Sequence, residues 1–352
     1  MTYHDVIQPH KEALFKYYQK YESEITSRLK SLPQKLTQKS VSYSKTSRLE
    51  GNKLFKRSYK DIETIKQIFV KYTKSISYAP KDSEHLALAY ESRSALLLHI
   101  KEFEETIKDI DRAHKITKCV TLKIKLICKK VECLKRLGRF DDDKILNEAI
   151  SLLTKFKKGS KEREFYEELI EEAKGQFEIY GNHIKTIKKT IPQDGILHEN
   201  ENKKVNDFSD IYLDYEKAYG KLLRAKKDFK TGEIVFVEKL YAAVPITERN
   251  FQMCNHCSLM TWSSIPCDNC SWALYCSENC KKEAWEKYHD FECPIICQED
   301  CLKDLRDSDI VIRTFIMGIK EAGTISKLKT ELEGGNKYIY TYMISYITKL
   351  FF

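Results

Sequence analysis

The chain has 352 residues, 42% hydrophobic and 32% charged, a composition ordinary for a soluble protein and a length that predicts more than one domain. No run of eighteen apolar residues occurs, so no transmembrane helix is expected. The net charge of +9 is unevenly spread, because residues 26–60 carry ten Lys and Arg against one acid, Glu50. We interpret this segment as solvated and partly flexible, with contact to nucleic acid or an acidic partner as the alternative.

Residues 45–156 have the pattern of helical repeats. Short polar turns that end in an aromatic residue, at 56–59, 100–103 and 137–140, are each followed by a helical pattern of apolar residues. The aromatics recur at intervals of 44 and 37 residues. The tetratricopeptide repeat has a period of about 34 residues. We expect three such repeats, with an unrelated helical bundle as the alternative.

The first interval is the longer one, which predicts extra residues in 62–70 or in the loop at 80–84. Repeat arrays present a concave groove to extended protein partners. Asn52 matches the first position of a carboxylate clamp found in some of these repeats, but Ser92 stands where a second Asn is expected. Three cysteines in predicted helices are interpreted as small apolar core residues: Cys119, Cys128 and Cys133.

Residues 219–239 predict two strands joined by a turn. Lys230-Thr231-Gly232 supplies the turn, because glycine adopts positive φ without strain. The following run from Ile234 to Val237 is β-branched and aromatic, as in strands. This hairpin by itself identifies no function.

Residues 254–293 contain eight candidate metal ligands in four closely spaced pairs. The ligands are Cys254, Cys257, Cys267, Cys270, Cys276, Cys280, His289 and Cys293. Eight such side chains suffice for two four-coordinate zinc ions with no open coordination position, which indicates structural rather than catalytic zinc. A segment of this size cannot build a large core, so metal binding is expected to supply much of its folding free energy.

The order and spacing of these pairs resemble the MYND zinc finger, in which the pairs interleave. The resemblance implies one zinc held by Cys254, Cys257, Cys276 and Cys280, and a second held by Cys267, Cys270, His289 and Cys293. The last two pairs have helical spacing, so both are expected on short helices. Cys297 and Cys301 continue the spacing and could replace Cys293, but Pro294 is expected to interrupt the helix, so we favour Cys293.

The finger is acidic, with three lysines against six acids. A DNA-binding module needs a basic surface, so direct DNA binding is not expected and we interpret the finger as a protein-contact and packing module.

The region before the finger, from Tyr219 to Lys239, resembles the opening of a SET domain. With the repeats, this opening and the finger in this order, the chain is similar to the SET and MYND domain-containing (SMYD-type) protein-lysine methyltransferases of the repeat-bearing branch. The resemblance implies S-adenosylmethionine as a cofactor, with Gly220 and Lys221 at its edge, a histone or non-histone lysine substrate, and a cytoplasmic and nuclear location. Leu222 stands where the family has a small residue, which weakens this cofactor contact.

SET enzymes also need a late Asn-His pair and a late tyrosine. After His289 the sequence contains no histidine, and after Cys301 no cysteine. No catalytic residue is therefore assigned, and we expect this chain to be inactive as given. The alternative is a non-catalytic adaptor built of repeats and finger. The apolar segment from Tyr338 to Phe352 is interpreted as the mark of a truncated or misassembled gene model.

These observations predict a multidomain, mainly α chain with a repeat array and a partial β-rich SET region interrupted by a two-zinc MYND finger. The expected parts are an N-terminal helical or flexible segment at 1–44, repeats at 45–156, a helix and linker at 157–211, the SET opening at 212–253, the finger at 254–293, a helical SET insert at 294–335 and an atypical tail at 336–352.

Overall fold

The computed structural model describes residues 39–56, 61–139, 142–175, 209–217, 219–236, 241–245, 251–296, 309–324, 326–328 and 330. The chain divides into two compact units. One contains the helices of residues 41–175, the finger and the helix that follows it, and the other contains a β-hairpin at 211–225. Among the described residues, no helix is both long and apolar enough to cross a membrane.

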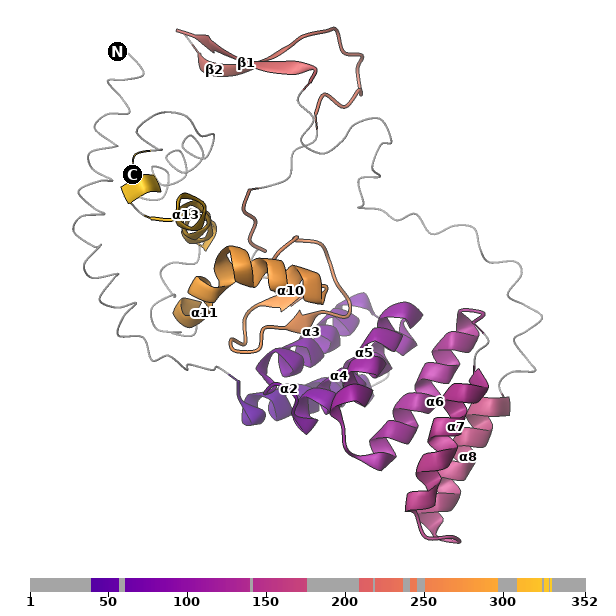
Figure 1. Ribbon diagram of the computed structural model, residues 1–352. Helices are drawn as coiled ribbons and strands as arrows, with labels where there is room; N and C mark the ends of the chain where they lie inside the picture. Colours follow the sequence, from indigo (N-terminus) through magenta and orange to yellow (C-terminus); the bar gives the residue numbers. More distant parts are fainter. Residues whose placement is uncertain are drawn as a thin grey trace. The chain divides into compact units, whose positions relative to one another are not determined.

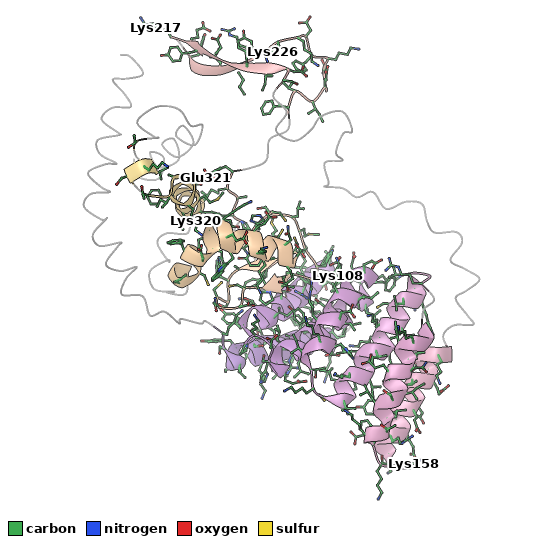
Figure 2. All side chains as sticks on the ribbon, in the orientation of Figure 1. Lys108, Lys158, Lys217, Lys226, Lys320 and Glu321 are labelled. Carbon is green, nitrogen blue, oxygen red and sulfur yellow. The ribbon has the colours of Figure 1, made fainter. Side chains whose placement is uncertain are left out.

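Seven helices form an array in which consecutive helices pack against each other (Figure 1). They are α2 (Val41–Lys56), α3 (Ile62–Tyr78), α4 (Glu84–His99), α5 (Phe103–Ile116), α6 (Val120–Arg136), α7 (Asp142–Leu152) and α8 (Lys161–Gly175), with the short 3-10 turn η1 (Leu153–Lys155) before α8. α2 packs on α3, α4 on α5, and α6 on both α7 and α8. Lys158 marks the turn between η1 and α8 in Figure 2.

Local sequence explains where these helices begin. The side chain of Asp61 accepts a hydrogen bond from the Thr64 amide at 2.7 Å, which caps α3, and Ser83 caps α4 in the same way. The turn before α5 has Lys101 at a positive φ of 66°, and the turn after α6 has Gly138 at 69°. α5 therefore begins at Phe103 as predicted, whereas Phe140 lies outside the described residues.

The array is held by three clusters of buried apolar side chains. The first centres on Ile68, Phe69, Tyr72, Leu96 and Leu97. The second includes Ile76, Leu86, Tyr90, Ile110 and Leu126. The third includes Ile124, Val131, Leu146, Tyr166 and Ile170. Since the third cluster takes residues from α8, the helical array continues past residue 156, the limit expected from the sequence.

The longer first interval between aromatic turns coincides with a longer helix and a longer loop. α3 has 17 residues, whereas the corresponding α5 has 14. The connection after α3 spans residues 79–83, and that after α5 spans only 117–119. The helix and the loop considered from the sequence are thus both longer than those at α5.

The hairpin pairs different strands from those predicted. β1 (Ile211–Glu216) runs antiparallel to β2 (Gly220–Ala225), with Ile211 opposite Ala225 and Glu216 opposite Gly220. Residues 230–233 do form the expected turn, closed by a 2.9 Å hydrogen bond, but residues 233–236 are not in a strand. β2 pairs with β1 instead, and the Tyr219 amide donates to the carbonyl oxygen of Glu216 at 3.1 Å where the two strands connect.

Candidate metal centre

The finger is a small two-stranded sheet followed by helices. β3 (Ile265–Pro266) pairs antiparallel with β4 (Leu274–Tyr275). α10 (Glu278–Ala284) follows, then one π-helical turn, η4 (Trp285–His289), and α11 (Asp290–Ile296). Single π turns in helices are common at functional sites. Pro294 lies inside α11, so the expectation that it interrupts the helix is wrong.

The fold brings the eight predicted ligand side chains into two groups of four. Cys254, Cys257, Cys276 and Cys280 form one group, and Cys267, Cys270, His289 and Cys293 form the other. Within each group all candidate ligand atoms lie within 4.8 Å of one another. The grouping is the interleaved one that the sequence resemblance implied.

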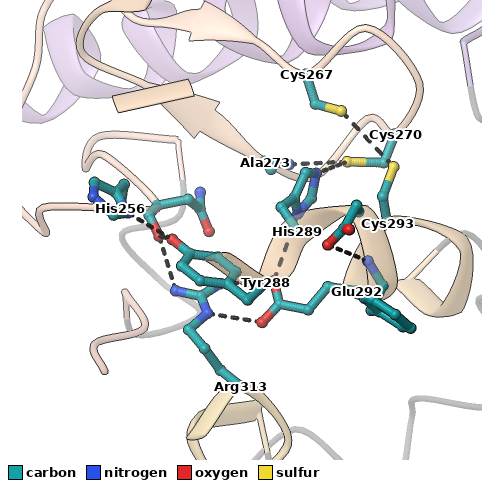
Figure 3. A network of polar contacts seen from close by, with 12 residues as sticks. His256, Cys267, Cys270, Ala273, Tyr288, His289, Glu292, Cys293 and Arg313 are labelled. Atoms are coloured by element: carbon teal, nitrogen blue, oxygen red, sulfur yellow. Dashed lines mark hydrogen bonds and ion pairs between the residues drawn. The ribbon is translucent and has the colours of Figure 1, made fainter. Parts of the chain in front are cut away.

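The distances within the groups fit a tetrahedral zinc ion. With Zn–S bonds of about 2.3 Å and Zn–N bonds of about 2.0 Å, a regular tetrahedron has S···S edges of about 3.8 Å and S···N edges of about 3.5 Å. The Sγ atoms of Cys257 and Cys276 are 3.7 Å apart, and those of Cys267 and Cys293 are 3.8 Å apart. Nε2 of His289 lies 3.5 Å from Sγ of Cys270 (Figure 3).

Local structure presents these sulfur atoms to a metal. The amides of His256, Asn269 and Ala273 each donate to a cysteine Sγ at 3.4 Å, which favours the thiolate form that binds zinc. Ser277 caps α10 by accepting from the Cys280 amide, which places Cys280 in the first helical turn. The pair of Cys276 and Cys280 thus has one ligand before a helix and one inside it, close to the prediction.

The pKa values of thiols in the two groups are shifted in opposite directions. Burial raises the pKa of Cys257 to about 11. In Cys254 burial is outweighed by hydrogen bonds from the backbone of residues 257, 276 and 256, and its pKa is lowered. Hydrogen bonds from Cys270 and Cys293 lower the pKa of Cys267. A metal that binds all four ligands of a group must therefore displace protons, so acid opposes its binding.

The remaining cysteines are distributed as predicted with one exception. Cys128 and Cys133 are buried in α6. Cys119 is exposed at the N-terminal cap of α6, so its assignment to the core is wrong. Cys297 and Cys301 lie outside the described residues.

A buried arginine of the array reaches into the finger. Arg93 of α4 forms a bidentate ion pair with Asp109 of α5 at 2.7 and 2.9 Å, and neither side chain is exposed. Its other N–H groups donate to Thr73 at 3.3 Å and to the hydroxyl and carbonyl oxygens of Ser264 at 3.0 and 2.6 Å. All five guanidinium donors therefore have acceptors, and two of these belong to the finger.

Further contacts surround this arginine. Arg112 of α5 donates to the carbonyl oxygen of Ser263 at 2.5 Å. The rings of Phe69 and Trp262 meet edge to face, with centroids 5.0 Å apart. Part of the array surface is thus occupied by the finger of the same chain. Sequence reasoning missed these residues, because nothing in the sequence around Arg93 indicates its partner 171 residues away.

Most acids of the finger contact basic side chains within the same compact unit. Asp268 pairs with Lys81 and Lys281, Glu283 with His256 and Lys287, Asp290 with Lys320, and Glu292 with Arg313. Lys81 belongs to the array, and Lys320 and Arg313 belong to α13 (Asp309–Ala322). The finger's acids thus contact basic residues of the same unit.

The residues predicted to contact a cofactor or a peptide lie in one strand and two helices. Gly220 and Lys221 begin β2, opposite Glu216 and Tyr215 of β1. Asn52 accepts a hydrogen bond from the Tyr72 hydroxyl at 2.9 Å. Ser92 is buried within α4. These two positions do not support a carboxylate clamp.

Comparison with known proteins agrees with this geometry. Residues 254–293 match the family model of the MYND finger. The chain is 28% identical to "Protein-lysine N-methyltransferase SMYD4" of Homo sapiens over 276 residues, and 28% identical to that of Pongo abelii over 275. The chain is homologous to the SMYD-type proteins.

The matched region covers most of this chain but only a part of each relative. The protein of the same name from Gallus gallus is 27% identical over 288 residues. Each of the two 28% matches covers 70% of this chain and 33% of the relative, so the chain spans about a third of the length of the relatives it matches. No solved structure matches.

Proposed function

We propose that the finger binds two structural zinc ions, one in each group of four ligands described above. The support is the agreement between the S···S and S···N separations and those of tetrahedral zinc. With all four positions filled by protein, neither zinc would activate water or substrate, and both would stabilise the fold. Metal analysis of the purified protein should find two zinc ions per chain, and one or none would contradict this.

We further propose that the chain carries modules of an S-adenosylmethionine-dependent protein-lysine methyltransferase. The observation that supports this most is the similarity to SMYD4 methyltransferases along 70% of the chain. In this proposal, the finger and the helical array form the scaffold, and the hairpin with Gly220 and Lys221 contributes one edge of a cofactor site. The substrate would be a lysine of a histone or another protein.

A polypeptide of these 352 residues is nevertheless expected not to methylate lysine. A methyltransferase must align the methyl donor and the lysine amine, and loss of such alignment costs several orders of magnitude in rate. The Asn-His pair that the family resemblance requires after the finger is not present in this sequence. Titration calorimetry with S-adenosylmethionine and a methyl-transfer assay test this, since submillimolar binding together with transfer would contradict it.

The second candidate function is an adaptor that binds proteins without catalysis. One specific observation favours it: the array and the finger share the buried Arg93 contact, so they can act as one rigid binding module. Proteins captured by the wild-type chain but lost when Arg93 is replaced by Met would support an adaptor. The cytoplasm and nucleus are the proposed location, which cell fractionation tests.

A further inference from the structure

We propose that Glu292 and Arg313 are positioning residues for the second zinc site, and that they orient the His289 ring so that its Nε2 atom faces the metal. The proposal rests on the proposed zinc-binding role of the finger. It adds α13, a helix outside the finger, to the metal site.

The first step is the orientation of the histidine ring. His289 is 1% exposed, and its ring makes T-shaped contacts with the rings of Tyr275 and Trp285, with centroids 5.9 Å away in each pair. Its Nε2 atom faces Sγ of Cys270 at 3.5 Å, while its Nδ1 atom faces Oε2 of Glu292 at 3.5 Å (Figure 3). A carboxylate accepts hydrogen bonds and does not donate them, so this contact favours the tautomer with hydrogen on Nδ1. Nε2 then keeps its lone pair for the metal.

The second step is what holds the carboxylate. Arg313 of α13 binds both oxygens of Glu292, with Nε 2.8 Å from Oε1 and an Nη atom 3.0 Å from Oε2. Both side chains are buried, at 5% and 6% exposure. A two-pronged arginine–carboxylate contact fixes the plane of the carboxylate as well as its position. Oε2 therefore has a defined place beside His289.

The third step is what holds the arginine. Its guanidinium lies over the Tyr288 ring at 4.2 Å from the centroid and donates to the carbonyl oxygens of Asn255 and Ala243. Asn255 directly follows the ligand Cys254, so the same arginine contacts both halves of the finger. Two helical turns further along α13 lies Lys320, which is labelled in Figure 2. Its Nζ atom lies 2.6 Å from each carboxylate oxygen of Asp290. These contacts fix α13 on α11, the helix that carries Cys293.

The test is zinc affinity and the environment of the bound metal in the full chain. We expect Glu292→Ala to weaken the second zinc site about 10- to 100-fold, measured by competition with a chromogenic chelator. The chain loaded with ¹¹³Cd should give two metal resonances, and Glu292→Ala should move or broaden only that of the site containing His289. Nitrogen-15 spectra of the imidazole report the tautomer directly.

Two further variants separate positioning from a merely structural role. Glu283→Ala is the matched control, because Glu283 also contacts an imidazole of the finger, that of His256 at 3.1 Å, which is not a predicted ligand. It should leave the second site unchanged. The double variant Glu292→Ala with Arg313→Met removes the unpaired buried cation, so it should restore folding stability without restoring the affinity or the tautomer.

Each outcome decides the matter. Wild-type affinity and an unchanged His289 tautomer in Glu292→Ala would overturn the proposal, and so would recovery of zinc affinity in the double variant. Simultaneous loss of both metal resonances in Glu292→Ala would assign Glu292 to folding of the whole finger and overturn it as well. A wild-type chain that binds no metal would overturn the zinc-binding role itself, which is a different result.

Discussion

The array and the finger are in contact, yet they are stabilised by different means. The array buries apolar side chains in three clusters that run from α2 to α8. The finger has two short strands and two groups of candidate metal ligands, with one buried ion pair between α11 and α13. The comparison indicates that the array should fold without metal, whereas the finger should not.

Removal of the metal should distinguish the finger from the array most clearly. All three tryptophans of the chain lie in the finger, at positions 262, 272 and 285, whereas most of the described helix lies in the array. A strong chelator should therefore change tryptophan fluorescence sharply and leave most of the far-ultraviolet circular dichroism intact. Structural zinc in finger peptides binds with about 10–16 kcal/mol, so this is the largest effect expected.

The Cys276→Ser variant should reproduce the fluorescence change in the presence of zinc. A parallel loss of helix on chelation would show that the array also depends on the metal and would contradict the distinction between the two regions.

The contact between the two regions is tested by Asp109→Asn. This change leaves the guanidinium of Arg93 buried without its counter-ion, which typically costs about 3–5 kcal/mol. Urea unfolding followed by circular dichroism should show the loss, and the environment of Trp262 should change because the same interface carries it.

Leu126→Ala is the matched control for that experiment. Leu126 is fully buried in the second cluster. Its replacement by Ala should lower the free energy of unfolding by about 2–5 kcal/mol, because it leaves a cavity. It should lower the stability of the array without altering Trp262 fluorescence. If both variants left the finger unchanged, Arg93 would not couple the two regions.

A smaller effect is expected from Gly51→Ala within the array. Alanine is normally favoured over glycine inside a helix by about 1 kcal/mol. Here an added Cβ would lie 2.6 and 2.8 Å from ring atoms of Tyr72, which is 1% exposed. Overpacking costs about 1–3 kcal/mol, so a net loss of stability is expected in thermal unfolding. A stabilised variant would show that Tyr72 can move away.

The smallest effect is a difference in the alkylation rates of cysteines, which can be measured without changing the fold. Burial raises the pKa of Cys128 to about 11 and that of Cys133 to about 12, so both stay protonated at neutral pH. Cys119 is exposed. In native, zinc-loaded protein, alkylation at pH 8 should label Cys119 before Cys128 and Cys133, as mass spectrometry of peptides can show.

The sign of the accompanying pH effect follows from these raised values. In the folded protein, the pKa values of Cys128 and Cys133 are higher than those of thiols in the unfolded chain. Their contribution to the free energy of unfolding is therefore fully present below the unfolded pKa, and it is lost as the pH rises through about 11 to 12. Rapid labelling of Cys133 at pH 8 would contradict its burial.

Sequence patterns predicted the features that depend on spacing along the chain. The eight ligands and their two groups followed from pair spacing together with the family resemblance, and the structure brings the same residues together. The helices around Phe103 followed from apolar periodicity. Ligand spacing and apolar periodicity are properties of short stretches of sequence, so they can be recognised without the structure.

Features that depend on distant residues were not predicted. Arg93 and Ser264 are 171 residues apart, and nothing in the local pattern of either indicates the other. Glu292 counted only as one of six acids, although Arg313 explains its position. The hairpin was misassigned because strand propensity at 234–237 is a local signal that does not identify the pairing partner, and β2 pairs with β1.

The Arg93 contact also determines an order of events during synthesis. Residues 41–175 fold through neighbouring helices, and such local contacts form fast and can form on the ribosome before the finger has been made. Until residue 264 emerges, the guanidinium of Arg93 would be paired with Asp109 but would lack the acceptors that Ser264 supplies. We expect nascent chains stopped before the finger to expose this pair and the ring of Phe69 to chaperones, and release of the chaperone to coincide with docking of the finger.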